Sequence, residues 1–461
     1  MNDSGLLLAI WGWEHSLPVI RRNDGMSELK KRTESAHWGR NMTQRGWFML
    51  LSLYMLALVG LGLACEPVEA ILSGLSRILQ SHSVLISDYM EIGGIGAALV
   101  NAGLVGMAGL LLAYLNGVLL SGPIIAAVFT MAGFGLFGKN VLNIWPIILG
   151  VVLFSRVTRH PFKSYILVAM FGTALAPLVS QVTYGFGLGL LPGLLFGLAA
   201  GFLLPPLAVY MLRLHQGFNI YNVGLTCGFL GLFIASLLGG LGLQLPLTLH
   251  WSTENSAMLG VSLLIYSISM LAVGLYLARG FTGLRGISHE AGTLPTDFVE
   301  LHGPGSSLIN MGLVGLIGWG YILLVGGVFN GPTIGAVLTM VGFAAFGKHV
   351  LNIPPIMLGV YLGCRLMVWY PSQPGPLLAA LFGTTLAPLS GVFGPLLGLL
   401  AGVVHLMLVM RTAAWHGGLN LYNNGFAGGL TATLLVGIIG WWSSWNEARK
   451  VEGGKRHHDQ R

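Results

Sequence analysis

Charge is scarce in this sequence. Asp, Glu, Lys and Arg make up 8% of its 461 residues, whereas they make up about 25% of an ordinary soluble domain. Hydrophobic residues account for 54%, and the mean hydropathy is +0.76. A soluble fold of this length could not cover its surface with so few charged side chains. The composition therefore predicts a protein that lies in a lipid bilayer.

Several motifs of enzymes and cofactor-binding proteins are also missing. The sequence contains no G-x-x-x-x-G-K-[S/T], no H-E-x-x-H and no C-x-x-C. Its three cysteines, Cys65, Cys227 and Cys364, lack the spacing of a metal site. We therefore predict no metal, no cofactor and no catalytic residue from these patterns. The net charge of +7 lies mostly at the two ends of the chain, where it suits anionic lipid better than nucleic acid.

What the sequence does contain is an internal duplication. Residues 88–154 align with residues 297–363 without a gap, at a constant offset of 209, and about half of the positions are identical. Two further motifs recur: F-G-T-x-L-A-P-L from Phe171 and Phe382, and H-x-G-x-N-x-Y-N-x-G from His215 and His416. This recurrence shows which polar positions kept their chemistry while the apolar residues between them changed. Those positions are where we expect function.

Each copy contains up to seven apolar segments. A helix needs about 20 apolar residues to cross a membrane, and the segments at 123–138 and 141–157 are shorter than that. Such a pair can form two crossings, which gives 14 membrane segments in all, or one re-entrant hairpin, which gives ten. We favour the hairpin, because its arms are short and contain or begin with Pro, and because a polar G-K-[N/H]-V-L-N lies between them.

The distribution of Lys and Arg predicts the orientation. Seven of these residues precede the first apolar segment, whereas the loop 66–92 contains Arg77 alone. Basic residues cluster again near 156–163 and in the C-terminal tail. Both termini are therefore predicted to be cytoplasmic. This pattern holds if each copy crosses the membrane an odd number of times, which inverts the second copy relative to the first.

We therefore predict an all-α bundle of two inverted repeats with 10–14 membrane segments in the inner (plasma) membrane. Its parts are a polar cytoplasmic arm at 1–45, membrane repeats at 46–242 and 257–442, and a basic cytoplasmic tail at 443–461.

Lys139 and Lys348 are the cations of the best-matched block, each in an F-G-K sequence between two short apolar arms. Placed at a hairpin tip near the N-terminus of the next half-helix, each would attract an anion. A charge inside the membrane is costly, so a pair of cations that recurs in both copies is a functional candidate. Alternatively, each Lys extends from a helix end to the interface.

Neutral polar residues recur around each Lys. They are Asn143, Asn352, Thr130 and Thr339. An Asn side chain offers two donors and an acceptor, so it can bind a polar solute or cap the second arm of the hairpin.

The H-x-G-x-N-x-Y-N-x-G motif is the most polar stretch that the copies share. Its candidate binding residues are His215, Asn219, Tyr221 and Asn222, with His416, Asn420, Tyr422 and Asn423. They could form a turn in which the Asn side chains satisfy backbone groups, or a binding loop at the mouth of a pathway.

Acidic residues are shared at Asp88 and Glu91, and at Asp297 and Glu300, each just before a long apolar segment. There they complement a helix dipole. None lies deep in an apolar segment, which argues against a carboxylate proton relay.

The sequences F-G-K-H-V-L-N-I-P-P at Phe346–Pro355 and H-G-G-L-N-L-Y-N-N-G-F at His416–Phe426 resemble those of a family of bacterial multi-pass membrane proteins known as a domain of unknown function. The resemblance covers nearly all of 46–442 and implies no activity. The paired short segments and the G-x-x-x-Y-N stretch are also similar to the urea channel family, although the Asn-Pro and Thr-Pro-Phe signatures of that family are missing.

We expect a transporter or channel-like permease for a small polar or anionic solute, with its site between the repeats. The alternative is a membrane-embedded enzyme or lipid-handling protein that uses His215 and His416 as acid–base groups. A catalytic site is usually single, whereas both copies keep this motif, so we favour the permease. The sequence leaves the coupling ion open and is compatible with a homo-oligomer.

Overall fold

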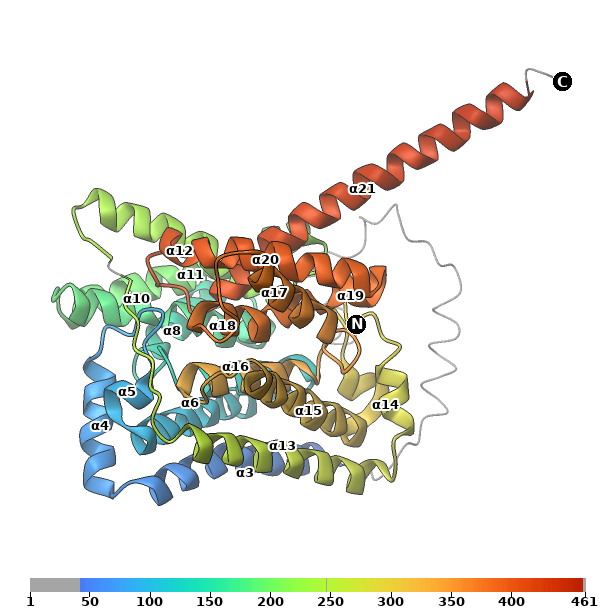
Figure 1. The fold of residues 1–461 in the computed structure, drawn as a ribbon. Helices are drawn as coiled ribbons and strands as arrows, with labels where there is room; N and C mark the ends of the chain where they lie inside the picture. The colour runs from blue at the N-terminus through green and yellow to red at the C-terminus, as the bar shows by residue number, and fades with distance from the viewer. Residues whose placement is uncertain (1–41, 246, 459–461) are drawn as a thin grey trace.

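The computed structural model describes residues 42–245 and 247–458, and every regular element in these ranges is helical (Figure 1). The predicted polar arm lies almost entirely outside the described residues. Within them, ten helical stretches are long and apolar enough to cross a membrane. These stretches are α3 (Gln44–Cys65), α6 (Ile95–Leu115), the broken helix Phe162–Gly185, α11 (Leu190–His215), α12 (Asn222–Gly240), α13 (Ser256–Ala278), α15 (Phe298–Leu324), the broken helix Pro374–Phe393, α20 (Pro395–Trp415) and the first part of α21 (Asn423–His458).

Two equivalent pairs of helices, one pair in each half, are too short for either member to cross a membrane on its own. They are α7 (Gly122–Phe134), α8 (Ile144–Val157), α16 (Gly331–Phe343) and α17 (Pro354–Leu366). Each has 13 or 14 residues, so each is about 20 Å long. In each half, two long helices come before the short pair: α3 and α6 in the first half, and α13 and α15 in the second. This reproduces the order expected from the duplication.

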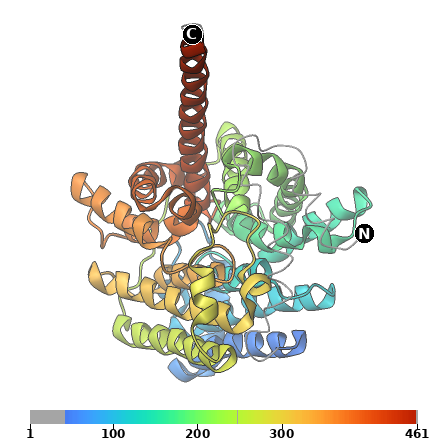
Figure 2. The ribbon, with the colours of Figure 1, turned by 90° about the vertical axis from the view of Figure 1, so that its right-hand side faces the viewer.

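Three pairs of equivalent helices meet between the two halves. In Figure 1, α3 and α13 lie side by side at one end of the molecule, where the rings of Tyr54 and Tyr266 are 5.1 Å apart. The helices α7 and α16 meet in the middle, and α12 and α21 meet beyond them at Gly224 and Gly425. Figure 2 shows the first half mainly on the right and the second half mainly on the left. The pairs therefore mark a pseudo-two-fold axis.

The contact between α7 and α16 is a direct contact of backbones. A Cβ atom on Gly133 would lie 2.5 Å from the carbonyl oxygen of Gly335, and a Cβ atom on Gly335 would lie 2.3 Å from that of Gly133. The first residue of α7, Gly122, lies against Ala345 just after α16, and Gly331 lies against Leu136 just after α7. The two short helices are therefore antiparallel and cover the same depth of the bundle.

Each half supplies a carboxylate to the other half's short helix. Asp297 accepts hydrogen bonds at 2.9 and 3.1 Å from the backbone of Val299 and Glu300 at the start of α15, and at 3.0 and 3.1 Å from Gly122 at the start of α7. The equivalent Asp88 caps α5 (Tyr89–Gly93) and lies against Gly331 at the start of α16. As expected, each carboxylate complements a helix dipole. Each does so for a helix of its own half and for a short helix of the other half.

The loop between the two short arms lies beside the interior of a long helix. Asn101 is six residues inside α6, about 9 Å along its axis, and its side chain donates to the carbonyls of Gly135 at 2.6 Å and Lys139 at 2.8 Å. Asn310 of α15 donates in the same way to Ala344 and Lys348, both at 2.7 Å. The short helices and the loops between them therefore form two equivalent helix–loop–helix elements, called hairpins below, and their loops, the tips, are anchored within the bundle.

Glycine is required at both tips. Gly138 and Gly347, which precede the two Lys residues, have φ angles of 96° and 99°, which side chains with a Cβ atom rarely adopt. The backbone at Gly138 also lies close to Leu421 and to the carbonyl of Ser83. The shared F-G-K sequence is thus partly a requirement of the turn.

The carboxylate contacts predict that Asp297 stabilises the association of the two halves. Replacing Asp297 with Ala removes the acceptor from backbone N–H groups on α7 and α15, so we expect the free energy of unfolding to fall by about 1–3 kcal/mol. Thermal unfolding of the detergent-purified protein measures this. Glu300→Ala, at an exposed position on the same helix, is the matched control and should change the midpoint little. Equal midpoints for the two variants would contradict the assigned role.

Candidate functional site

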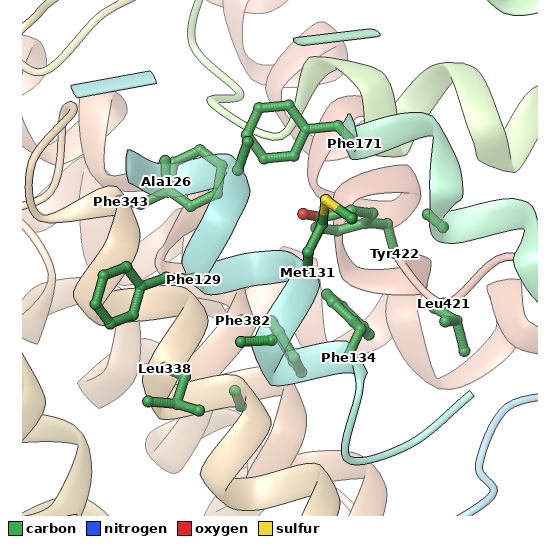
Figure 3. Packing of buried hydrophobic residues seen from close by; sticks show 14 of the residues in the cluster. Ala126, Phe129, Met131, Phe134, Phe171, Leu338, Phe343, Phe382, Leu421 and Tyr422 are labelled. Carbon is green, nitrogen blue, oxygen red and sulfur yellow. The ribbon is translucent and has the colours of Figure 1, made fainter. Parts of the chain in front are cut away.

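Aromatic rings from both halves surround the inner ends of the short helices. Phe134, the last residue of α7, stacks on Phe382 at 5.3 Å and contacts Tyr422 at 4.7 Å, both of which belong to the second half. Figure 3 shows these three rings gathered at the end of α7. The equivalent Phe343 contacts Phe171 at 5.5 Å and Tyr221 at 4.5 Å in the first half. Each half therefore packs its short helix against the aromatic residues of the other.

The two tyrosines occupy the centre of this cluster. The ring centroids of Tyr221 and Tyr422 are 5.5 Å apart. Lys348 Nζ lies 4.5 Å from the Tyr221 centroid, and Lys139 Nζ lies 5.6 Å from the Tyr422 centroid. The Lys side chains of the two hairpin tips thus point back toward the pseudo-two-fold axis. The structure brings four of the predicted residues together: Lys139, Lys348, Tyr221 and Tyr422.

Both lysines are completely buried, with a relative accessibility of 0%, so neither side chain extends to the membrane–water interface. Lys348 Nζ donates to the hydroxyl of Tyr221 at 2.6 Å and to that of Thr384 at 2.7 Å. Lys139 Nζ has no hydrogen-bond partner, and it lies over the rings of Phe134 and Tyr422. Within the described residues, neither ammonium forms an ion pair with a carboxylate.

Thr130 and Thr339 lie on the short helices near the axis. Thr130 is next to the hydroxyl of Tyr422, and Thr339 Oγ1 would be 3.2 Å from a Cβ atom on Gly133. Each hydroxyl donates to a carbonyl one turn earlier in its own helix, at 2.6 Å for Thr130 and 2.8 Å for Thr339. Each oxygen retains the capacity to accept a hydrogen bond.

Asn143 and Asn352 hold the hairpin tips. Asn143 Oδ1 accepts from the backbone N–H of Asn140 at 2.8 Å, and its amide donates to the carbonyl of Gly138 and the hydroxyl of Ser180, both at 3.0 Å. Asn352 makes the equivalent backbone contacts with His349 and Gly347. The polar groups of these two residues are used within the protein.

The His and Asn residues of the H-x-G-x-N-x-Y-N-x-G motif also bond one another. His215 Nδ1 accepts from the backbone of Asn219 at 3.2 Å, which places the ring proton on Nε2, where it is donated to Asn222 Oδ1 at 3.0 Å. The Asn222 amide donates to the carbonyl of Ala208. His416, Asn420 and Asn423 repeat this arrangement. Both ring nitrogens of each His are therefore engaged in holding a turn.

This turn fixes the tyrosine that follows it. Asn219 donates to the carbonyl of Gly425 at 3.1 Å, and Asn420 donates to that of Gly224 at 3.3 Å, so each turn is bonded to the other half. Tyr221 and Tyr422 are directed by these bonds into the aromatic cluster. The motif therefore contributes its tyrosines to the cluster, whereas its His and Asn residues position them.

Sequence reasoning missed Thr384, Phe134 and Phe343 as neighbours of the lysines. It also missed Thr385, which bonds the turn that carries Tyr221. The signal was available in the recurring F-G-T-x-L-A-P-L motif. Here the chain breaks its helix, with the 3₁₀ turns η2 (Thr173–Leu175) and η4 (Gly383–Leu386) inside the two broken helices, and η4 presents the hydroxyl of Thr384 to Lys348.

The ten apolar stretches and the buried polar centre define a multi-pass membrane protein. The chain belongs to the family described as proteins of unknown function, DUF1576, whose sequence model matches residues 68–239 and 278–441. The two matched segments correspond to the two halves of the fold, and the family predicted from the motifs is confirmed. No curated protein and no solved structure shows a significant match to the chain.

The hydrogen bonds at the two tyrosines predict different effects of the same substitution. Tyr221→Phe removes an acceptor from the buried ammonium of Lys348, so we expect the free energy of unfolding to fall by about 1–3 kcal/mol. Tyr422→Phe removes a hydroxyl that has no hydrogen-bond partner and should leave stability unchanged or slightly higher. Thermal unfolding of the two purified variants compares them, and a larger loss for Tyr422→Phe would contradict the assignment.

Proposed function

We propose that the protein is a transporter or channel-like permease for a small anionic solute, with its site between the two halves at Lys139 and Lys348. The observation that supports this most directly is the pair of fully buried Lys side chains whose Nζ atoms, within the described residues, have no carboxylate partner. Both lie where equivalent elements of the two halves meet, which is the common location of sites in transporters built from repeats.

Desolvation makes a buried charge on Lys costly. Moving an ammonium out of water costs several kcal/mol even after the protein relaxes. The rings of Phe134 and Tyr422 offset about 0.5–2 kcal/mol of this through cation–π attraction, and the carboxyl end of α7 also favours a cation. These terms leave part of the cost uncompensated. An anion beside the ammonium would supply the missing charge and acceptor.

The hairpins support the same function. With arms of about 20 Å and tips beside Asn101 and Asn310, each hairpin enters the bundle from one side and returns to that side as a re-entrant element. Irregular backbone at membrane depth is tolerated where protein or a polar pathway surrounds it. The chain then has ten spans, five in each half, so the halves are inverted and both termini lie on the cytoplasmic side of the inner membrane.

The alternative of a membrane-embedded enzyme has less support from the geometry. An acid–base catalyst must offer a ring nitrogen to its substrate. In His215 and His416, one nitrogen accepts from the backbone and the other is bonded to an Asn side chain. Neutral solutes would use the hydroxyls of the same cluster, so the transport experiment includes urea as a neutral probe.

The inverted arrangement predicts the sides of three loops. Reporter domains fused after residues 75 and 250 should report the exterior, and one fused after residue 160 should report the cytoplasm, because the Lys and Arg residues of the loops require it. Alkaline phosphatase and green fluorescent protein fusions in bacterial cells distinguish the two sides. If two of the three fusions report the opposite side, the inverted topology is wrong.

The charge argument predicts that both lysines are needed for flux. In proteoliposomes, uptake of chloride, nitrate, formate, phosphate and urea would be compared for the wild-type protein and for Lys139→Met and Lys348→Met. Losing a charged hydrogen-bond donor costs about 1.5–3 kcal/mol, so we expect anion flux to fall about ten-fold or more, and Lys→Arg to impair it less.

Arg156→Met is the matched control for this experiment, because Arg156 is an exposed cation at the end of α8. It should leave flux unchanged. Normal anion flux in both Lys→Met variants would overturn the proposed function, and selective uptake of urea would replace the anion with a neutral solute.

A further inference from the structure

The surroundings of Lys139, called the first side, and those of Lys348, called the second side, are not equivalent. Lys348 is satisfied by two hydroxyls, one from each half of the chain, whereas Lys139 has none. Counterparts of both hydroxyls are present in the chain. Tyr422 is the counterpart of Tyr221, and Thr173, which donates to the carbonyl of Met170, is the counterpart of Thr384, which donates to that of Leu381. Lys139 donates to neither of them.

A sequence difference accompanies this asymmetry. Thr385 Oγ1 donates to Asn219 Oδ1 at 2.6 Å and accepts from the backbone of Tyr221 at 3.0 Å, so it ties the turn that carries Tyr221. The equivalent residue beside the other turn is Ala174, which has no hydroxyl and bonds that turn through its carbonyl alone. The hydroxyl of Thr385 thus holds Tyr221 where it meets Lys348. The turn that carries Tyr422 has no such hydrogen bond from the side chain of Ala174.

Among the polar groups near Lys139 that are left without partners, two belong to side chains that face each other. They are Lys139 Nζ and the hydroxyl of Tyr422, both fully enclosed by protein, with the ammonium 5.6 Å from the tyrosine ring. A buried donor without an acceptor is costly, and an ammonium has three donors and no acceptor of its own. The arrangement therefore has the hydrogen-bonding capacity for an acceptor with negative charge.

We propose that Lys139 and Tyr422 form the anion subsite of the proposed permease, that it takes a weakly hydrated monovalent anion, and that the equivalent position at Lys348 is closed by Tyr221 and Thr384. This rests on the proposed function and specifies which half of the pseudo-symmetric site binds the solute. Lys139 supplies the charge, and Tyr422 supplies a hydroxyl that can donate.

The class of anion follows from what surrounds the subsite. Within the described residues, its neighbours include the Lys139 amine, the hydroxyls of Tyr422 and Thr130, the thiol of Cys227 and aromatic rings. The cost of removing an ion from water rises with the square of its charge, and a single ammonium cannot offset it for a divalent ion. Nitrate or another monovalent anion that gives up water readily suits the subsite, whereas sulfate and hydrogen phosphate do not.

The test measures anion binding to the detergent-purified full-length protein by isothermal titration calorimetry at constant ionic strength, with sodium nitrate and sodium sulfate as probes. We expect nitrate to bind and sulfate to bind at least about ten-fold more weakly. Lys139→Met should raise the Kd for nitrate about ten-fold or more, and Tyr422→Phe should raise it about three- to ten-fold.

The matched comparison is Tyr221→Phe, which changes the equivalent hydroxyl beside Lys348 and should weaken nitrate binding less than Tyr422→Phe does. Because Tyr→Phe is a mild change, these two variants keep the test valid if Lys139→Met fails to fold. Equal weakening by Tyr221→Phe and Tyr422→Phe would overturn the asymmetric subsite, and equal binding of sulfate would overturn the class of anion.

The same experiment separates this inference from the proposed function. If both Lys→Met variants lose flux while nitrate binding depends equally on the two sides, the permease stands and the assignment to Lys139 fails. If the wild-type protein binds neither anion, the subsite fails, and flux measurements decide whether a neutral solute passes instead.

Discussion

The structure depends on the contact between the backbones of α7 and α16. At Gly133 and Gly335, the two antiparallel helices approach so closely that a Cβ atom on either residue would collide with a carbonyl oxygen of the other. This contact fixes how the two short helices lie against each other and therefore where their last residues, Phe134 and Phe343, project. It also brings the start of each helix to the carboxylate of the opposite half. A wider contact would separate the tyrosines from the lysines that they face.

Beside this contact lies a polar centre in which the two Lys residues occupy equivalent positions but form different hydrogen bonds. The hairpin tips are anchored equivalently by Asn101 and Asn310, and both send a Lys toward the axis. One ammonium is then satisfied by the hydroxyls of Tyr221 and Thr384, and the other is not. Under the proposed function, such a difference would give the two sides different affinities for the same solute. The free energy that Lys139 lacks in its hydrogen bonds would then be available for binding the anion.

Much of the fold followed from the sequence, because composition and repetition are properties of the chain itself. The helical membrane character and the family were predicted and are confirmed, and the four short helices fall at the predicted short segments. The lysines and tyrosines were also selected by recurrence. What the sequence could not provide were contacts between residues of opposite halves, such as Asp297 with Gly122. These contacts depend on the packing of helices far apart in the chain. Because the two copies carry the same residues, the sequence does not reveal whether such a residue contacts its own half or the other half.

The most direct measurement of the central claim is a structure of the full-length protein determined with bromide, whose position can be identified by anomalous scattering. The account predicts one bromide within hydrogen-bond distance of Lys139 Nζ and the Tyr422 hydroxyl, with Lys348 still bonded to Tyr221 and Thr384. A bromide at Lys348 instead, or none at either Lys at a concentration that inhibits nitrate binding, would contradict it.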